Sequence, residues 1–103
     1  MNNKTILFLG ASNYFLDAAK YVKEKGYKLI AVDNQELPKA VVKSIADESY
    51  SISTIDIERV YELCINKNVD GIYAGASEVN IPVAIELCER LGLPYYCLLY
   101  TSP

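Results

Sequence analysis

Histidine is absent from this chain of 103 residues, and glycine is scarce, with five copies. The absence of histidine removes both the commonest general base and the commonest zinc ligand. The three cysteines form no CxxC pair, so a zinc site built on paired cysteines is not indicated either. The phosphate loop of the GxxxxGK type is also missing. We therefore predict no metal site and assign no catalytic residue within this chain.

Basic runs and long apolar runs are missing as well. The net charge is −3, and the chain lacks the grouped Lys and Arg that nucleic-acid contacts need. No charged-then-apolar signal opens the sequence, and no apolar run approaches about 18 residues. We expect a cytoplasmic protein that binds neither nucleic acid nor membrane, with Cys64 and Cys88 as buried thiols in a reducing compartment.

What is present is an apolar fraction of 51%, enough for the core of one small domain. Short apolar runs predict strands, and segments with apolar residues at helical spacing predict helices. The strands are expected at 4–9, 28–32, 49–52, 69–74 and 93–96, and the helices at 13–25, 39–46, 57–68 and 80–91. This alternation predicts an α/β fold, a Rossmann-like three-layer α/β/α sandwich with a parallel sheet of strand order 3-2-1-4-5.

Several residues have the character of helix boundaries. Ser12 or Asn13 is expected to cap the first helix, and Ser53 with Asp56 fits a capping pair for the third. Pro82 is tolerated only in a first turn, which places the start of the last helix near position 80.

The loop after the first strand, Gly10–Tyr14, holds one glycine where a dinucleotide loop holds three. Asn13 and Phe15 carry side chains where a smooth pyrophosphate cradle would need none. The helix start still offers free amides, so a carboxylate or a single phosphate could dock there. The alternative is an ordinary strand-to-helix turn without a ligand.

The loop after the fourth strand, Gly75–Val79, contains one charged residue, Glu78. In the expected strand order both loops border the crevice where the sheet reverses direction, which is where such sheets bind ligands. Glu78 could hold an amine or a hydroxyl of a ligand, or could act only as a favourable acid near a helix N-terminus, worth roughly 0.3–1 kcal/mol. Ser77 could either cap the helix or bind.

Asp33 ends the second strand, where a dinucleotide fold places the acid that binds a ribose hydroxyl. It is a weak candidate for cofactor binding because the glycines that should accompany it are missing. A stand-alone Rossmann-type domain that binds a dinucleotide or another small ligand is therefore the alternative to the function considered next, and a structural or regulatory domain without a ligand is a third.

The series "ILFLGAS", "GYKLIAVD", "AD" at positions 46–47 and "VDGIYAGASEVNIPVAIELCERLGLP" resembles the N-terminal, pre-ATP-grasp domain of ATP-grasp ligases, most of all carbamoyl-phosphate synthase large-subunit-like proteins. The resemblance covers about residues 4–96. It implies a domain that precedes a two-part ATP-grasp module, which binds ATP and Mg²⁺, forms an acyl-phosphate and lets an amine attack. The cofactors would be bound by that module and none by this chain.

The resemblance further implies that the two loops hold part of a small-molecule acceptor, with Glu78 at the position of an acid that does so in glycinamide-ribotide-type members. The residues expected at this site are Gly10, Ser12, Asn13, Tyr14, Ser77 and Glu78. Asn13 and Tyr14 stand where those members have an acidic-apolar pair, so a different acceptor is expected. The missing ATP-grasp module would be a partner, and the longer protein is expected to form a homodimer.

The domain is expected to comprise residues 1–96. The last seven residues, "CLLYTSP" at 97–103, resemble the translated read-through of a sequencing adapter and are expected to be a non-native or truncated tail, with a genuine strand as the alternative. On this interpretation the chain is the substrate-side domain of a ligase and is inactive without the ATP-grasp module.

Overall fold

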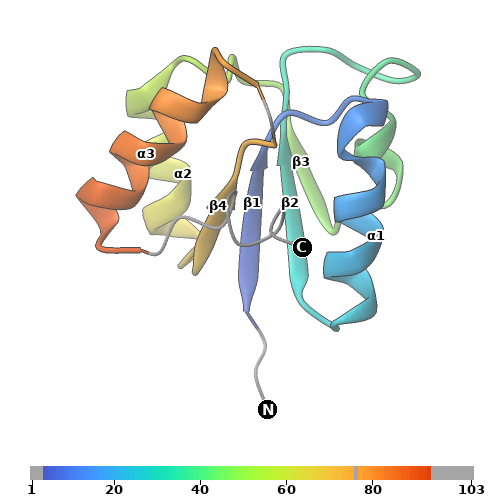
Figure 1. Ribbon diagram of the computed structural model, residues 1–103, viewed down its shortest axis with the longest axis horizontal. Coiled ribbons are helices and arrows are strands. Elements are labelled where there is room, and N and C mark those ends of the chain that lie inside the picture. The colour runs from blue at the N-terminus through green and yellow to red at the C-terminus, as the bar shows by residue number, and fades with distance from the viewer. Residues whose placement is uncertain (1–3, 76, 94–103) are drawn as a thin grey trace.

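The computed structural model describes residues 4–75 and 77–93 and contains strands and helices in alternation (Figure 1). Two of the helices are short 3₁₀ turns, labelled η. The elements are β1 Thr5–Leu9, η1 Asn13–Phe15, α1 Leu16–Glu24, β2 Lys28–Val32, η2 Val41–Ser44, β3 Glu48–Tyr50, α2 Ile57–Asn66, β4 Gly71–Tyr73 and α3 Asn80–Leu91.

All pairings in the sheet are parallel, and the strand order is β3-β2-β1-β4. This confirms the predicted fold class and the order of the first four strands. The expected fifth strand, at 93–96, falls almost entirely outside the described residues.

The sheet lies between two layers of helices (Figure 1). The helix α1 and the turn η2 cover one face, and α2 with α3 covers the other. Because successive side chains of a strand point to opposite faces, Leu7 and Leu9 pack with α2 and α3, whereas Ile6 and Phe8 pack with α1. The strands β1, β2 and β4 are therefore almost wholly apolar, as expected for strands that are buried on both faces, whereas the edge strand β3 contains Glu48 and Ser49.

The helix predicted at 13–25 begins as a 3₁₀ turn, and its α-helical part is Leu16–Glu24. Neither Ser12 nor Asn13 caps it through a side chain, so this prediction was wrong. Instead the main-chain carbonyl of Ser12 accepts a hydrogen bond from the amide of Phe15 at 2.9 Å, which closes the 3₁₀ turn.

The helix predicted at 39–46 is only the 3₁₀ turn Val41–Ser44. The capping pair is also wrong: the Asp56 side chain makes no capping hydrogen bond, and the Ser53 hydroxyl accepts the Ile55 amide at 3.4 Å. The strands at 49–52 and 69–74 are three-residue strands, Glu48–Tyr50 and Gly71–Tyr73.

The last helix matches its prediction, since α3 spans Asn80–Leu91 and Gly92 ends it in the left-handed conformation. Pro82 therefore lies in the first turn, where its missing N–H costs nothing.

Cys64 of α2 and Cys88 of α3 are buried in the core, as predicted. Burial raises the pKa of the Cys64 thiol to about 12 and that of Cys88 to about 11. Among the described residues, none of the helices has the length and apolar character that a bilayer crossing needs.

Candidate substrate-binding edge

The two candidate loops lie at the same edge of the sheet because β1 and β4 are neighbouring parallel strands. Leu7 pairs with Ile72 and Phe8 with Tyr73, so both strands end at nearly the same level. This is the upper edge of the sheet in Figure 1, opposite the N-terminus of β1. From β1 the chain continues to β2 on one side, whereas β4 pairs with β1 on its other side. The loops after β1 and β4 therefore lie on either side of the point where the strand order reverses.

The ring of Phe15 lies against both loops. A Cβ atom built on Gly10 would stand 2.6 Å from the Cζ atom of this ring, and one built on Gly75 would stand 3.2 Å from its Cε2 atom. Both glycines also have positive φ, +129° and +62° respectively. The ring packs in turn on Phe8 and Tyr73, with centroids 6.0 Å and 5.9 Å away. Phe15 thus sets the separation of the two loops, and glycine is required wherever the loops touch it.

Asn80, the first residue of α3, joins three segments of this edge through its side chain. Its amide nitrogen donates to the main-chain carbonyl of Leu9 at 3.0 Å, which fixes α3 to the end of β1. Its side-chain oxygen accepts the hydroxyl of Thr54 at 2.6 Å, from the loop after β3. Sequence reasoning placed Asn80 at a helix start but did not recognise this role, because partners 71 and 26 positions away leave no local pattern.

The structure gives Ser77 a capping role. Its hydroxyl accepts the amide of Asn80 at 3.2 Å, and its carbonyl accepts the amide of Ile81 at 2.9 Å, which is the geometry of a residue that begins a helix. Glu78 follows on the exposed side of the loop. Glu78 is therefore accessible to solvent at this edge of the sheet, while the Ser77 side chain beside it bonds to the start of the helix.

The residues of the first loop become more exposed to solvent from Gly10 to Tyr14. Gly10 is buried, Ser12 is half-buried, and Asn13 and Tyr14 are exposed. With Ser77 and Glu78 opposite, the six residues predicted for the site come from two adjacent loops. Their polar groups are hydroxyls, an amide and one carboxylate, which together can hold neutral or cationic groups of a small molecule.

Asp33 joins the loops after β1 and β2. One of its carboxylate oxygens accepts the amide of Ala11 at 2.9 Å, and the other accepts the amide of Gln35 at 2.9 Å. The bond from Ala11 holds the first candidate loop against the end of β2, and the bond from Gln35 is local to the loop after β2. A role of Asp33 toward a ribose stays a prediction, but such a ligand would have to share the carboxylate with both amides.

The loops 10–14 and 75–79 lack two features that phosphate-binding loops often have. The Phe15 ring fills the space beside Gly10, and neither loop carries a Lys or Arg. In the part of the chain that the structure describes, no three residues of His, Cys, Asp or Glu gather as metal ligands would.

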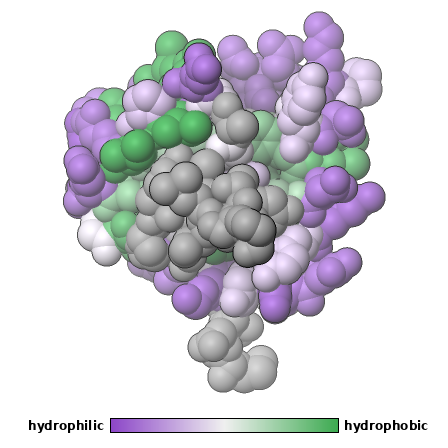
Figure 2. All heavy atoms as spheres, in the orientation of Figure 1, coloured by the Kyte–Doolittle hydropathy of each residue, from purple (hydrophilic) through white to green (hydrophobic). Residues whose placement is uncertain are grey.

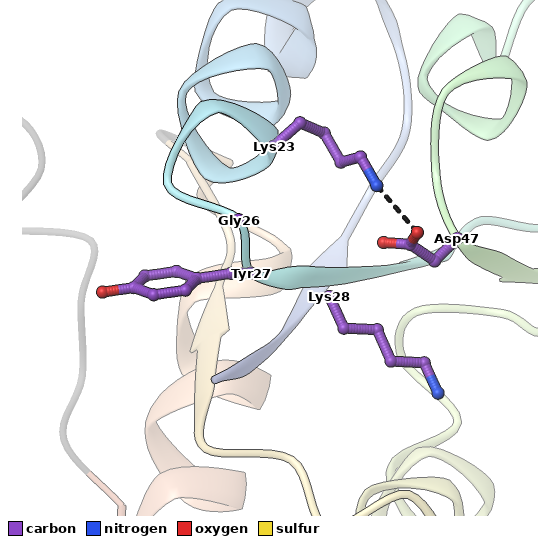
Figure 3. A pocket seen from close by; sticks show the side chains of 5 residues that line it. All are labelled: Lys23, Gly26, Tyr27, Lys28 and Asp47. Atoms are coloured by element: carbon purple, nitrogen blue, oxygen red, sulfur yellow. Dashed lines mark hydrogen bonds and ion pairs between the residues drawn. The ribbon is translucent and has the colours of Figure 1, made fainter. Parts of the chain in front are cut away.

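An open depression occurs at the opposite edge, among Lys23, Gly26, Tyr27, Lys28 and Asp47 (Figure 3). The Asp47 carboxylate stabilises the fold at this edge. It accepts a hydrogen bond from the main-chain amide of Leu29 at 2.7 Å and forms an ion pair with Lys23 at 2.7 Å. Burial alone would raise the pKa of Asp47, but the hydrogen bonds from Lys23 and from the Leu29 main-chain amide outweigh burial and lower this pKa.

The neighbouring Glu48 is similarly engaged. It lies 2.7 Å from the Lys28 nitrogen and 3.1 Å from that of Lys67, and it accepts the hydroxyl of Tyr50 at 2.6 Å. Hydrogen bonds from Lys28, Tyr50 and Lys67 lower the pKa of Glu48 to about 2. Asp47 and Glu48 are therefore both held in ion pairs with lysines, and we assign the candidate site to the other edge.

Comparison with solved structures gives matches over nearly all of the chain. Phosphoribosylglycinamide synthetase from Anaerococcus prevotii matches with a TM-score of 0.77 and 24% identity, over 90% of this chain and 23% of that one. The biotin carboxylase domain of Hydrogenobacter thermophilus 2-oxoglutarate carboxylase, in complex with MgADP, ADP and bicarbonate, matches with a TM-score of 0.72 and 24% identity, over 89% and 22% of the two chains. N5-carboxyaminoimidazole ribonucleotide synthetase from Thermotoga maritima matches with a TM-score of 0.70 and 21% identity, over 89% and 24%.

These structures are ligases of the ATP-grasp family, as the sequence resemblance predicted, and the chain shares the fold of their N-terminal domains. The chain spans about a quarter of the length of each of them. No protein-family model matches the chain, and a search of curated proteins gives no significant match.

Proposed function

We propose that this chain is the N-terminal, substrate-side domain of an ATP-grasp carboxylate–amine ligase of the carbamoyl-phosphate synthase-like kind. The observation that carries the proposal is the meeting of the loops after β1 and β4 at one edge, held by the contacts of Phe15 and the hydrogen bond between Asn80 and Leu9. In this proposal six residues of the two loops would form one wall of a binding site, and a partner would supply the other wall. The shared fold supports the assignment.

In this function the wall binds the acceptor substrate. Glu78 would hold its amine or hydroxyl by a charge-assisted hydrogen bond, and Ser12, Asn13 and Tyr14 would contact it from the facing loop. Gly10 would let the acceptor approach the main chain closely, and Ser77 would fix the start of α3 through its hydrogen bond with Asn80. Holding the acceptor in one orientation is the contribution that such a wall makes to rate.

ATP and Mg²⁺ would be bound by the ATP-grasp module of the longer protein, which also supplies the phosphoryl chemistry. The chain alone would then be inactive. A cytoplasmic location and a homodimeric longer protein belong to the same proposal, and one of the structural neighbours is described as a domain dimer.

Calorimetric titration with MgATP and with NAD tests the proposal. The chain of residues 1–103 should show no saturable heat with either nucleotide, whereas the longer protein that carries it should bind MgATP. Saturable binding of NAD by the chain, weakened in an Asp33→Ala variant, would instead establish the dinucleotide-binding alternative. A longer protein that does not bind MgATP would refute the ligase assignment.

A further inference from the structure

Polar side chains hold the candidate edge together on the face of the sheet opposite to Phe15. Hydrophilic residues, with hydrophobic ones between them, reach the upper border of the molecule in Figure 2, where this edge lies. The helices α2 and α3 cover this face side by side, and both begin at the candidate edge (Figure 1). Thr54, in the loop before α2, and Asn80, at the start of α3, are half-buried and bonded to each other, so they join the two helix starts.

The contacts of the Asn80 side chain fix the orientation of its amide group. The main-chain carbonyl of Leu9 can only accept a hydrogen bond, so the amide nitrogen of Asn80 must face it, at 3.0 Å. The side-chain oxygen of Asn80 then faces Thr54, whose hydroxyl donates to it at 2.6 Å. Removal of the Thr54 hydroxyl would therefore take away the donor that holds the amide in this orientation.

These contacts reach Glu78 through the main chain. The Asn80 amide donates to the Ser77 hydroxyl at 3.2 Å and the Ile81 amide donates to the Ser77 carbonyl at 2.9 Å, which closes the turn 77–80 that carries Glu78. Among the described residues, none forms a hydrogen bond with the Glu78 carboxylate itself. The position of this carboxylate therefore depends on the turn and on what anchors the turn.

The carbonyl of Leu9 connects this turn to the facing loop. Leu9 directly precedes Gly10, the first residue of the loop after β1. The hydrogen bond from Asn80 thus sets the spacing between the two candidate loops from one face of the sheet, as the Phe15 ring does from the other.

We propose that Asn80 and Thr54 are positioning residues of the acceptor site and that they act on the acceptor through Glu78. This inference rests on the proposed function. Thr54 holds the Asn80 amide in the orientation that binds Leu9, and Asn80 holds the turn of Glu78 beside the loop after β1. The loop after β3 thereby belongs to the site through Thr54, without a contact to the acceptor. Fixing Glu78 in advance lowers the cost of ordering it when the acceptor binds.

Nuclear magnetic resonance of the chain of residues 1–103 tests whether Thr54 holds this turn. Thr54→Val removes the hydroxyl and keeps the shape of the side chain, whereas Thr54→Ser keeps the hydroxyl. Thr5→Val is the matched control, with the same substitution at the opposite edge of the sheet. Asn80→Asp is a second disrupting variant, which keeps the acceptor for Thr54 and loses the donor to Leu9. It decides the question if Thr54→Val does not fold.

The measured quantity is the order parameter of the Glu78 main-chain amide. In the parent chain, in Thr54→Ser and in Thr5→Val it should lie near the value of about 0.85 that rigid backbone shows. In Thr54→Val and Asn80→Asp it should fall clearly below that value, because the turn has lost its anchor. An unchanged order parameter in the disrupting variants would overturn the positioning role.

Steady-state kinetics of the longer protein tests whether Thr54 acts through Glu78. The acceptor in this assay is an amine that stimulates ADP release from MgATP. Thr54→Val should raise the KM for this amine about threefold to tenfold and change the KM for ATP less than about twofold. In a Glu78→Gln background the same substitution should change the KM for the amine less than about twofold, because the group on which Thr54 acts is already gone. Equal rises in the two backgrounds would overturn the proposal.

Titration of the longer protein with MgATP separates this proposal from the proposed function. Absence of MgATP binding refutes the ligase assignment, while the order of Glu78 in the short chain still decides whether Thr54 holds the turn. Binding of MgATP together with an unchanged KM for the amine in Thr54→Val overturns the positioning role and leaves the ligase assignment standing.

Discussion

At the residue scale, the candidate site depends on a close approach between backbone and one aromatic ring. Gly10 and Gly75 both contact Phe15, and both have a positive φ that residues with a Cβ rarely adopt. The single glycine of the first loop therefore leaves room for the Phe15 ring. Gly26 has a similar φ of +78° but open space around its Cα, which makes it a control for the cost of the backbone conformation alone.

Gly10→Ala should lower the free energy of unfolding by roughly 2–4 kcal/mol, because the new methyl group meets the buried ring of Phe15 in an already strained conformation. Gly26→Ala should cost only about 1 kcal/mol, from the conformation alone. Urea unfolding of both variants and of the parent chain measures the difference. Equal losses in the two variants would show that the ring does not restrict the loop.

At the scale of elements, the periodicity of the sequence predicted most of the fold. Long amphipathic segments such as 57–68 and 80–91 were identified because their apolar residues recur on one side of a helix, although α2 ends at Asn66. The 3₁₀ turns at 13–15 and 41–44 were not, since three or four residues are too few to show a period. The predicted capping hydrogen bonds were also wrong, because a sequence that matches a capping pattern does not by itself bring the side chain within hydrogen-bond distance of the main-chain amide.

Ion pairs join three elements at the edge opposite the site. Glu48, at the start of β3, contacts Lys28 at the start of β2 and Lys67 at the end of α2. Its pKa is lowered in the folded chain from 4.5 to about 2. A lowered folded-state pKa means that these contacts stabilise the fold above the unfolded pKa and that this stabilisation is lost as the pH falls from about 4.5 toward 2.

Glu48→Gln should therefore reduce the free energy of unfolding at pH 7, by no more than about 1 kcal/mol because the pairs are partly exposed to solvent. The difference from the parent chain should shrink as the pH is lowered through this window, which urea unfolding at a series of pH values measures. Glu62→Gln, an exposed acid on α2, is the control and should behave like the parent. A difference that stays constant with pH would contradict the role of the charge.

At the scale of the whole molecule, the strand order determines which loops meet. The sequence predicted that order, and with it the shared edge of the residues around Ser12 and Glu78, because connections in parallel α/β sheets follow few patterns. It did not predict the roles of Asn80 and Thr54, whose hydrogen bond links residues 26 positions apart.

The central claim is that the loops after β1 and β4 form a wall for the acceptor and not a nucleotide cradle. The most direct measurement is steady-state kinetics of a Glu78→Gln variant of the longer protein, with the acceptor identified by its ability to stimulate ADP release. Glu89→Gln, an exposed acid at the other end of α3, is the control. We predict that Glu78→Gln raises the KM for the acceptor about tenfold or more, because it removes a charge-assisted hydrogen bond, and changes the KM for ATP less than about twofold. An equal rise in both constants, or no rise in either, would contradict this account.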